Sequence, residues 1–174
     1  ARQAWLDYLK IDPSSPWADE ARLHLERLNR EDRLAAQLRD QANQLRRSAF
    51  SGDLEAASLL ATRAPEMARQ LVQNTILPSW GRSSLEGNLI EAARQLAIAR
   101  AIVPPLHSVD KDSLLTEALV AIDEAASDPR RLHRLQLGHR DYGAGMEALD
   151  KRNPEAARPH LEAARESLGT GKSR

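Results

Sequence analysis

The chain has 174 residues, a length that suits one domain or one continuous repeat array and that can bury a sizeable core. Its 25 Lys and Arg residues balance 25 Asp and Glu residues, whereas a nucleic-acid-binding protein usually shows a basic excess or stripe. The chain contains no cysteine, which excludes a disulfide framework and thiol chemistry. We therefore expect no nucleic-acid partner, and the cysteine-free composition fits a cytoplasmic protein.

The sequence also lacks the features of a membrane or secreted protein. Its most apolar stretch, residues 96–106, carries Arg100 and two prolines and is too short to cross a bilayer. No signal peptide is visible. We expect no membrane partner and a cytoplasmic location. Because the chain opens at Ala1 inside an amphipathic pattern, without a methionine, we also expect it to be a fragment of a longer protein.

Composition predicts an all-α fold. Hydrophobic residues make up 41% of the chain and are mostly Ala and Leu, while aromatic residues make up 3%. Few β-branched residues and no sustained period-2 alternation argue against strands. In chain order, the apolar periodicity predicts helices over residues 1–11, 16–28, 34–50, 54–64, 65–77, 89–103, 114–126, 129–151 and 154–168.

Several breaks between these helices have clear signals. Ser15 is placed to cap the second helix, with Pro16 at its first position. The helix that opens at Pro65 is expected to kink or break at Pro78, because an interior proline removes a hydrogen bond. Pro104 and the adjacent Pro105 are expected to end the sixth helix and to begin an irregular loop to residue 112. Residues 169–174 read as a frayed end.

The apolar faces of these helices indicate the expected core. In the third helix the face is Leu34, Leu38, Ala42 and Leu45. In the last helix Ala157, Leu161 and Ala164 share one face, which we expect to pack on the helix that starts at Pro129. The three tryptophans are interpreted as core anchors, and Trp80 is the one that a turn at Pro78 would expose; they are Trp5, Trp17 and Trp80.

An internal repeat emerges when three turns are superposed. Each copy has a turn residue, a residue two places on, and then small or apolar residues every three or four positions, which builds one packed helix face. The copies are Gly52, Leu54, Ala57, Ala61 and Ala64; Gly87, Leu89, Ala92, Leu96 and Ala99; and Arg152, Pro154, Ala157, Leu161 and Ala164. The first two copies are 35 residues apart, close to the roughly 34 of a tetratricopeptide unit. The third follows after 65 residues, so the array is degenerate.

Three segments resemble a known family. AWLDYLKIDPSSPWADEARLHLERL resembles the helix, Asp-Pro break and following helix at the end of a tetratricopeptide unit. ILPSWGRSSLEGNLIEAARQLAIARAI and LLTEALVAIDEAASDPRRLHRLQLGHRDYGAGM are similar to the degenerate helical region that precedes the peptidase domain of bacterial CHAT-domain proteins. The resemblance covers most of the chain and implies a sensing or scaffolding segment. The caspase-like domain and its His-Cys dyad are absent from this sequence, so no peptidase activity carries over.

No motif for chemistry is complete. The five histidines show no metal-ligand spacing and no HExxH pattern; they are His24, His107, His133, His139 and His160. The segment GTGKS at residues 169–173 suggests a phosphate loop, but Glu166 stands where that loop requires glycine. Four serines lie in helical or turn contexts without a G-x-S-x-G elbow: Ser48, Ser58, Ser83 and Ser84. The sequence thus predicts no catalytic, cofactor-binding or metal-binding residue, and the packing pattern assigns no partner-binding residue.

These observations predict one degenerate, tetratricopeptide-like array of antiparallel helix hairpins over residues 1–174, an irregular α-superhelix of about eight to nine helices. A break near residues 104–112 is one alternative. The function expected for such an array is a non-catalytic interaction or scaffold module of a larger bacterial protein, which binds a peptide or a partner domain. The alternative is a regulatory or structural spacer that packs on and controls an adjacent caspase-like peptidase domain. No cofactor is expected.

Overall fold

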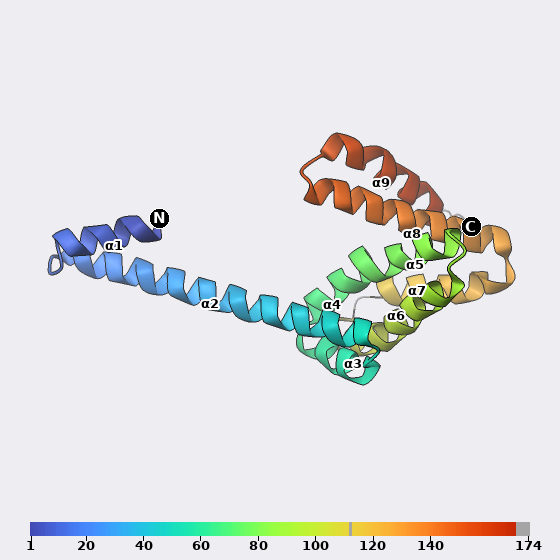
Figure 1. The fold of residues 1–174 in the computed structure, drawn as a ribbon, viewed down its shortest axis with the longest axis horizontal. Coiled ribbons are helices and arrows are strands. Elements are labelled where there is room, and N and C mark those ends of the chain that lie inside the picture. Colours follow the sequence, from blue (N-terminus) through green and yellow to red (C-terminus); the bar gives the residue numbers. More distant parts are fainter. Residues whose placement is uncertain (112, 170–174) are drawn as a thin grey trace. The chain divides into compact units, whose positions relative to one another are not determined.

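A computed structural model describes residues 1–111 and 113–169, and every regular element in that part of the chain is helical, which confirms the all-α prediction. The elements, shown in Figure 1, are α1 (Arg2–Ile11), α2 (Pro16–Ser51), α3 (Leu54–Arg63), α4 (Pro65–Leu71), η1 (Val72–Ile76), α5 (Leu77–Leu85), α6 (Leu89–Asp110), α7 (Leu114–Glu124), η2 (Ala125–Ser127), α8 (Pro129–Asp150) and α9 (Pro154–Gly169). The phosphate-loop-like residues 170–173 lie outside the described residues.

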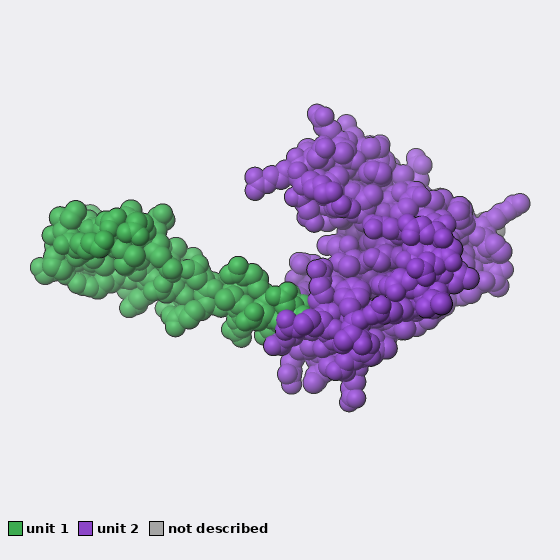
Figure 2. Space-filling model, in the orientation of Figure 1, with its two compact units in different colours: residues 1–43 green, residues 44–174 purple. Residues whose placement is uncertain are grey.

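The chain forms two compact units, residues 1–43 and residues 44–174 (Figure 2). The boundary falls inside α2 and not in the stretch 104–112, where the sequence offers a break as one alternative. Most of the large buried side chains belong to the second unit. The main hydrophobic core therefore belongs to residues 44–174.

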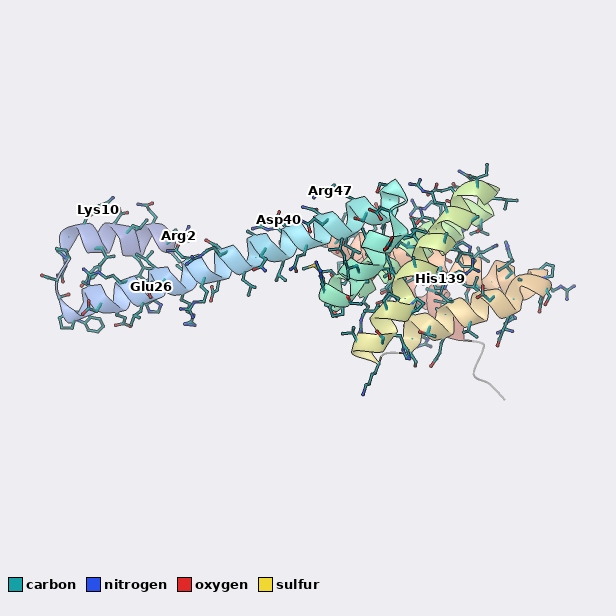
Figure 3. All side chains as sticks on the ribbon, turned by 90° about the horizontal axis from the view of Figure 1, so that it is seen from below. Arg2, Lys10, Glu26, Asp40, Arg47 and His139 are labelled. Atoms are coloured by element: carbon teal, nitrogen blue, oxygen red, sulfur yellow. The ribbon has the colours of Figure 1, made fainter. Side chains whose placement is uncertain are left out.

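The first unit is an antiparallel helix pair. Arg2 of α1 donates hydrogen bonds to Asn29 Oδ1 (2.5 Å) and to Asp32 Oδ2 (2.7 Å) of α2, and Figure 3 labels Arg2 beside that helix. At the other end of the pair, the Ala18 N–H donates to Ser15 Oγ (3.3 Å), which confirms the predicted N-cap. Ala18 and Ala21 are fully buried and Trp5 of α1 stacks on His24 of α2, so apolar and polar contacts together pair the two helices.

The predicted second and third helices are one helix, α2, so the prediction of a break near residues 29–33 is wrong. That stretch contains neither Gly nor Pro, and its Asn, Arg, Glu and Asp residues are compatible with a helix. The expected core face is also partly wrong. Leu34 and Leu38 are 56% and 42% exposed, whereas Leu45, further along the same face, is buried in the second unit. The apolar periodicity identifies this face of the helix, but it does not show which part of the face packs against another element.

The second unit is a stack of helix pairs. In it α6 packs on α3 and on α5, while α8 packs on α5 and on α9. Its apolar core draws on all of the elements from the end of α2 to α8. The side chains that are largest and most fully buried are Leu45, Ile76, Leu77, Ile98, Ile102, Val72 and Val103. This core holds α5 between α6 and α8.

The three turns of the internal repeat share one backbone geometry. Gly52, Gly87 and Arg152 have φ values of 91°, 78° and 57°, the left-handed conformation that commonly ends a helix. After each comes an N-cap residue, whose side chain accepts a hydrogen bond from the N–H three residues on. These caps are Asp53 to Ala56 (3.1 Å), Asn88 to Glu91 (3.2 Å) and Asn153 to Ala156 (3.1 Å). The repeat is therefore a repeated helix–turn–helix connection, although Leu89, the residue two places after the second turn, is 71% exposed and lies outside the core.

The predicted end of the sixth helix at Pro104 is wrong, because α6 continues through Pro104 and Pro105 to Asp110. Each proline removes one backbone hydrogen bond. Burial of Val103 and Leu106, which directly flank the two prolines, offsets this loss, since both side chains lie in the core. Asp112, the last residue of the expected loop, lies outside the described residues.

The C-terminal hairpin agrees with its prediction. Ala157 and Ala164 of α9 are buried. Leu161 packs against Gly145 of α8, where a Cβ atom would lie 2.6 Å from its Cδ2 atom. Leu168 lies in the same way over Gly138, with its Cδ2 atom 2.7 Å from the position of a Cβ. Glycines on α8 thus allow the two helices to approach closely.

Candidate functional site

The site begins at an irregular turn in the long helical run from Pro65 to Leu85. Pro78 has no N–H, and in a regular α-helix its ring would clash with the carbonyl of Asn74. The structure relieves this conflict with a π-helical segment, η1, in which the Leu77 N–H donates to the Val72 oxygen, five residues back. The sequence predicts a kink or a break at Pro78; the helical run is instead widened by a π-turn just before Pro78 and continues through it. Such π-turns often occur at functional sites.

The π-turn is tied to α8 by Tyr142. Gln73 Nε2 donates to Tyr142 Oη (2.9 Å), and Tyr142 Oη in turn donates to Asn74 Oδ1 (3.3 Å). Burial raises the pKa of Tyr142, although the hydrogen bond from Gln73 opposes this, so the phenol keeps its proton. Because Asn74 Oδ1 is engaged, its amide nitrogen remains the group that can bind something else.

Close backbone contact fixes α5 against α8. A Cβ atom on Gly143 would lie 2.5 Å from Pro78 Cβ, and a Cβ atom on Gly81 would lie 2.5 Å from the Gln136 carbonyl oxygen. Only glycine fits at such contacts without a shift of the backbone. The two helices therefore keep a defined separation beside the π-turn.

A groove of about 290 Å³ lies where η1, α5 and α8 meet. We call it the α5–α8 groove; it is lined by Asn74, Thr75, Pro78, Ser79, Arg82, Gly143, Met146, Glu147 and Asp150. The surface of the second unit is hollowed between α4 and the C-terminal end of α8 (Figure 2). The volume is at the lower limit of small-ligand pockets, roughly 300 Å³.

The polar groups of this groove are largely unengaged. Within residues 1–111 and 113–169, the side chains of Thr75, Ser79, Arg82 and Asp150 make no hydrogen bond or ion pair. Glu147 is different, because it accepts a hydrogen bond from Lys151 Nζ at 2.7 Å. That bond chiefly holds the pKa of Glu147 low, with smaller contributions from the charges of Lys151 and Arg82. The groove thus presents donors on the η1–α5 wall and carboxylates on the α8 wall.

A second groove, of about 310 Å³, lies between α6 and α7. Its floor is apolar, with Val103 and Leu119 buried at the base. Arg100 and Asp123 form an ion pair at its edge. Its charged groups are therefore paired with each other, which leaves an apolar surface with little means of orienting a ligand.

In the described part of the chain, His139 is the one titratable group with a large pKa shift, and its surroundings do not suit catalysis. It lies among the helices of the second unit (Figure 3), where burial lowers its pKa to about 4. Its ring meets Trp80 edge to face at 5.6 Å. Among the described residues no hydrogen bond or carboxylate orients the imidazole, as a general base requires. His139 is a core residue.

The prediction that the three tryptophans are core anchors is correct for one of them and wrong for another. Trp80 is 3% exposed, which confirms it as a core anchor, but Trp17 is 68% exposed, so that prediction is wrong. Trp5 is half-buried and stacks on His24 at 4.8 Å. The described residues contain no group of three or more His, Asp or Glu side chains arranged to hold a metal ion.

Sequence reasoning missed the α5–α8 groove. Its residues do share a helical spacing, since Thr75, Ser79 and Arg82 follow at steps of four and three. Gly143, Glu147 and Asp150 do the same on α8. These two polar stripes, one of which spans a proline, are the signal that could have found it.

Comparison with protein-family models, with curated proteins and with solved structures gave no significant match to this chain. Among the described helices, none has the length and apolar character needed to span a membrane.

Proposed function

We propose that this chain is a non-catalytic interaction module that binds a peptide segment of a partner protein in the α5–α8 groove. The observation that carries the proposal is the set of unengaged polar side chains along both walls of that groove. An extended peptide presents N–H and C=O groups along its length, and such groups need donors and acceptors on the protein. No group in the groove is arranged as a nucleophile or a general base, which favours binding over catalysis.

The groove is also pre-formed. The contacts at Gly81 and Gly143 fix the distance between its walls, and Tyr142 fixes the π-turn. A pre-formed groove needs little ordering when it binds, so less of the interaction energy is lost. The alanine-rich repeat supports the same function, because stacked helix pairs commonly serve as binding surfaces.

Site-specific photocrosslinking tests this function. A photoreactive amino acid replaces Ser79 in the groove or, as the control, Glu162 on the exposed face of α9, in the full parent protein in its own cells. We expect a discrete protein adduct at position 79 that is absent at position 162. The same adducts at both positions, or none at position 79, would contradict the proposal.

A second function, a regulatory spacer, is favoured by one observation. Residues 31–40 of α2 are all exposed, as in a helix that bridges two parts of a protein. The resemblance to the helical region of CHAT-domain proteins supports this alternative, in which the module controls an adjacent peptidase domain. Deletion of residues 1–174 from the parent protein separates the two functions. A spacer predicts altered activity with unchanged partner recruitment, whereas an interaction module predicts lost recruitment.

A further inference from the structure

We infer that the α5–α8 groove recognises the free carboxylate at the C-terminus of its peptide. The inference rests on the proposed function, because it specifies which part of a peptide the groove holds. It comes from the distribution of donors and acceptors between the two walls.

The η1–α5 wall supplies donors that fit an anion, from one guanidinium and two hydroxyls. Arg82 offers a planar fork of N–H groups that can bind both oxygens of a carboxylate. Ser79 lies three residues before Arg82 on the same helix, and Thr75 precedes Ser79 by four, so both hydroxyls lie on the same face as Arg82. None of these three side chains makes a hydrogen bond or a close ion pair with another described residue, although the charge of Arg82 acts on Glu147 across the groove.

Asn74 adds a donor at the end of this row. The Asn74 Oδ1 atom accepts the hydrogen bond from Tyr142, so the Asn74 amide N–H groups are the ones that can donate to a ligand. Asn74 lies in the π-turn and lines the groove beside Pro78, four residues further on. Four donor side chains on one wall suit the two oxygens of a terminal carboxylate better than the single oxygen of an internal peptide carbonyl.

The α8 wall sets the limit on charge. Asp150 and Glu147 line it, and Lys151 neutralises only Glu147. Asp150 repels a dianion such as phosphate more strongly than a singly charged carboxylate, and a peptide can also offer backbone N–H groups to Asp150. Met146 provides an adaptable apolar contact for the side chain of the last residue. The two walls together therefore suit a ligand that has one carboxylate at its end and backbone N–H groups next to it.

The test uses nuclear magnetic resonance on the whole ¹⁵N-labelled chain. Three probes are titrated: N-acetyl-alanyl-leucine with its free carboxylate, the same dipeptide as its C-terminal amide, and inorganic phosphate. Arg82→Gln removes the charge from the groove. Arg130→Gln is the matched control, because Arg130 is also exposed and its side chain makes no ion pair within the described chain.

We expect the free acid to shift backbone amides in residues 74–82 and 143–150 with a dissociation constant on the order of 1 mM. We expect about tenfold weaker binding of the amide, of phosphate, and of the acid to Arg82→Gln, with no change in Arg130→Gln. Equal binding of acid and amide overturns the inference while leaving peptide binding intact. No shift with the acid, equal binding of phosphate, or unchanged binding to Arg82→Gln also overturns it; the crosslinking at Ser79 then decides the proposed function separately.

Discussion

Gly81 of α5 faces the backbone of Gln136 on α8 so closely that an added Cβ atom would lie 2.5 Å from the Gln136 carbonyl oxygen. A backbone oxygen cannot move aside as the end of a side chain can. The contact therefore fixes how near α5 comes to α8, and with it the width of the groove that the two helices line.

Gly81→Ala should destabilise the protein by about 1–3 kcal/mol, because the new methyl group forces the two backbones apart. Urea denaturation measures the change. Gly169→Ala is the control, since nothing lies within 4 Å of a Cβ at that position, and it should leave stability nearly unchanged. Equal effects of the two substitutions would mean that α5 and α8 are not in close contact.

The shared turn geometry predicts opposite effects at two equivalent positions. Arg152 has a φ of 57° and Gly87 a φ of 78°, a conformation that costs a residue with a Cβ roughly 1 kcal/mol. Gly87→Ala should lower the thermal midpoint. Arg152→Gly should keep or raise the midpoint, because relief of the backbone strain in the folded state at least offsets the greater flexibility of glycine in the unfolded chain. A lower midpoint for Arg152→Gly would show that the third turn differs from the other two.

His139 should make stability depend on pH. Burial lowers its folded pKa from 6.5 to about 4, so between these values the unfolded state binds more protons than the folded state. The free energy of unfolding is therefore unaffected by His139 above about pH 6.5, where the imidazole is neutral in both states. As the pH falls toward 4, the preference of the unfolded state for the proton lowers the free energy of unfolding by up to about 3 kcal/mol.

Urea denaturation from pH 7 to pH 4 checks this dependence. In His139→Leu the slope of unfolding free energy against pH should be smaller by up to one proton's worth between pH 4 and pH 6.5. The comparison uses slopes and not absolute stabilities, so the altered packing against Trp80 does not affect it. Identical slopes in the two proteins would place His139 in contact with water.

Tyr142→Phe should cost roughly 1 kcal/mol, because it removes the hydrogen bonds to Gln73 and Asn74. It should also shift the amide resonances of residues 72–76, since the π-turn loses its link to α8. Tyr8→Phe is a matched control in the first unit, where the hydroxyl likewise bonds two side chains, Asp12 and Ser15. That control should leave residues 72–76 unchanged, and a shift there would argue for a global effect.

Local signals in the sequence predict much of this fold. The turns at Gly52, Gly87 and Arg152 follow from residues that are adjacent in the chain, and so do the caps that come after them. The packing of α9 on α8 follows from an apolar period of 3.6 residues. In these cases the interactions that stabilise the structure are between residues close together in the chain, so a local sequence pattern is enough to predict it.

The errors arise where tertiary packing outweighs local preference. Pro104 and Pro105 should end a helix, but the burial of Val103 and Leu106 holds α6 together. The groove depends on the approach of α5 to α8, two helices separated along the chain by α6 and α7. The two stripes at helical spacing mark a candidate face on each helix, but no local pattern encodes that the two faces meet, so the groove itself is recognised only in the structure.

Selection from a random peptide library with free C-termini tests the central claim most directly. The wild-type chain, Ser79→Trp and Glu162→Trp are compared as targets, with circular dichroism and thermal midpoints as a check on folding. We predict that wild type and Glu162→Trp enrich the same peptides, and that Ser79→Trp, whose indole fills the groove, enriches none of them. Enrichment of the same peptides on a folded Ser79→Trp chain would contradict peptide binding in the α5–α8 groove.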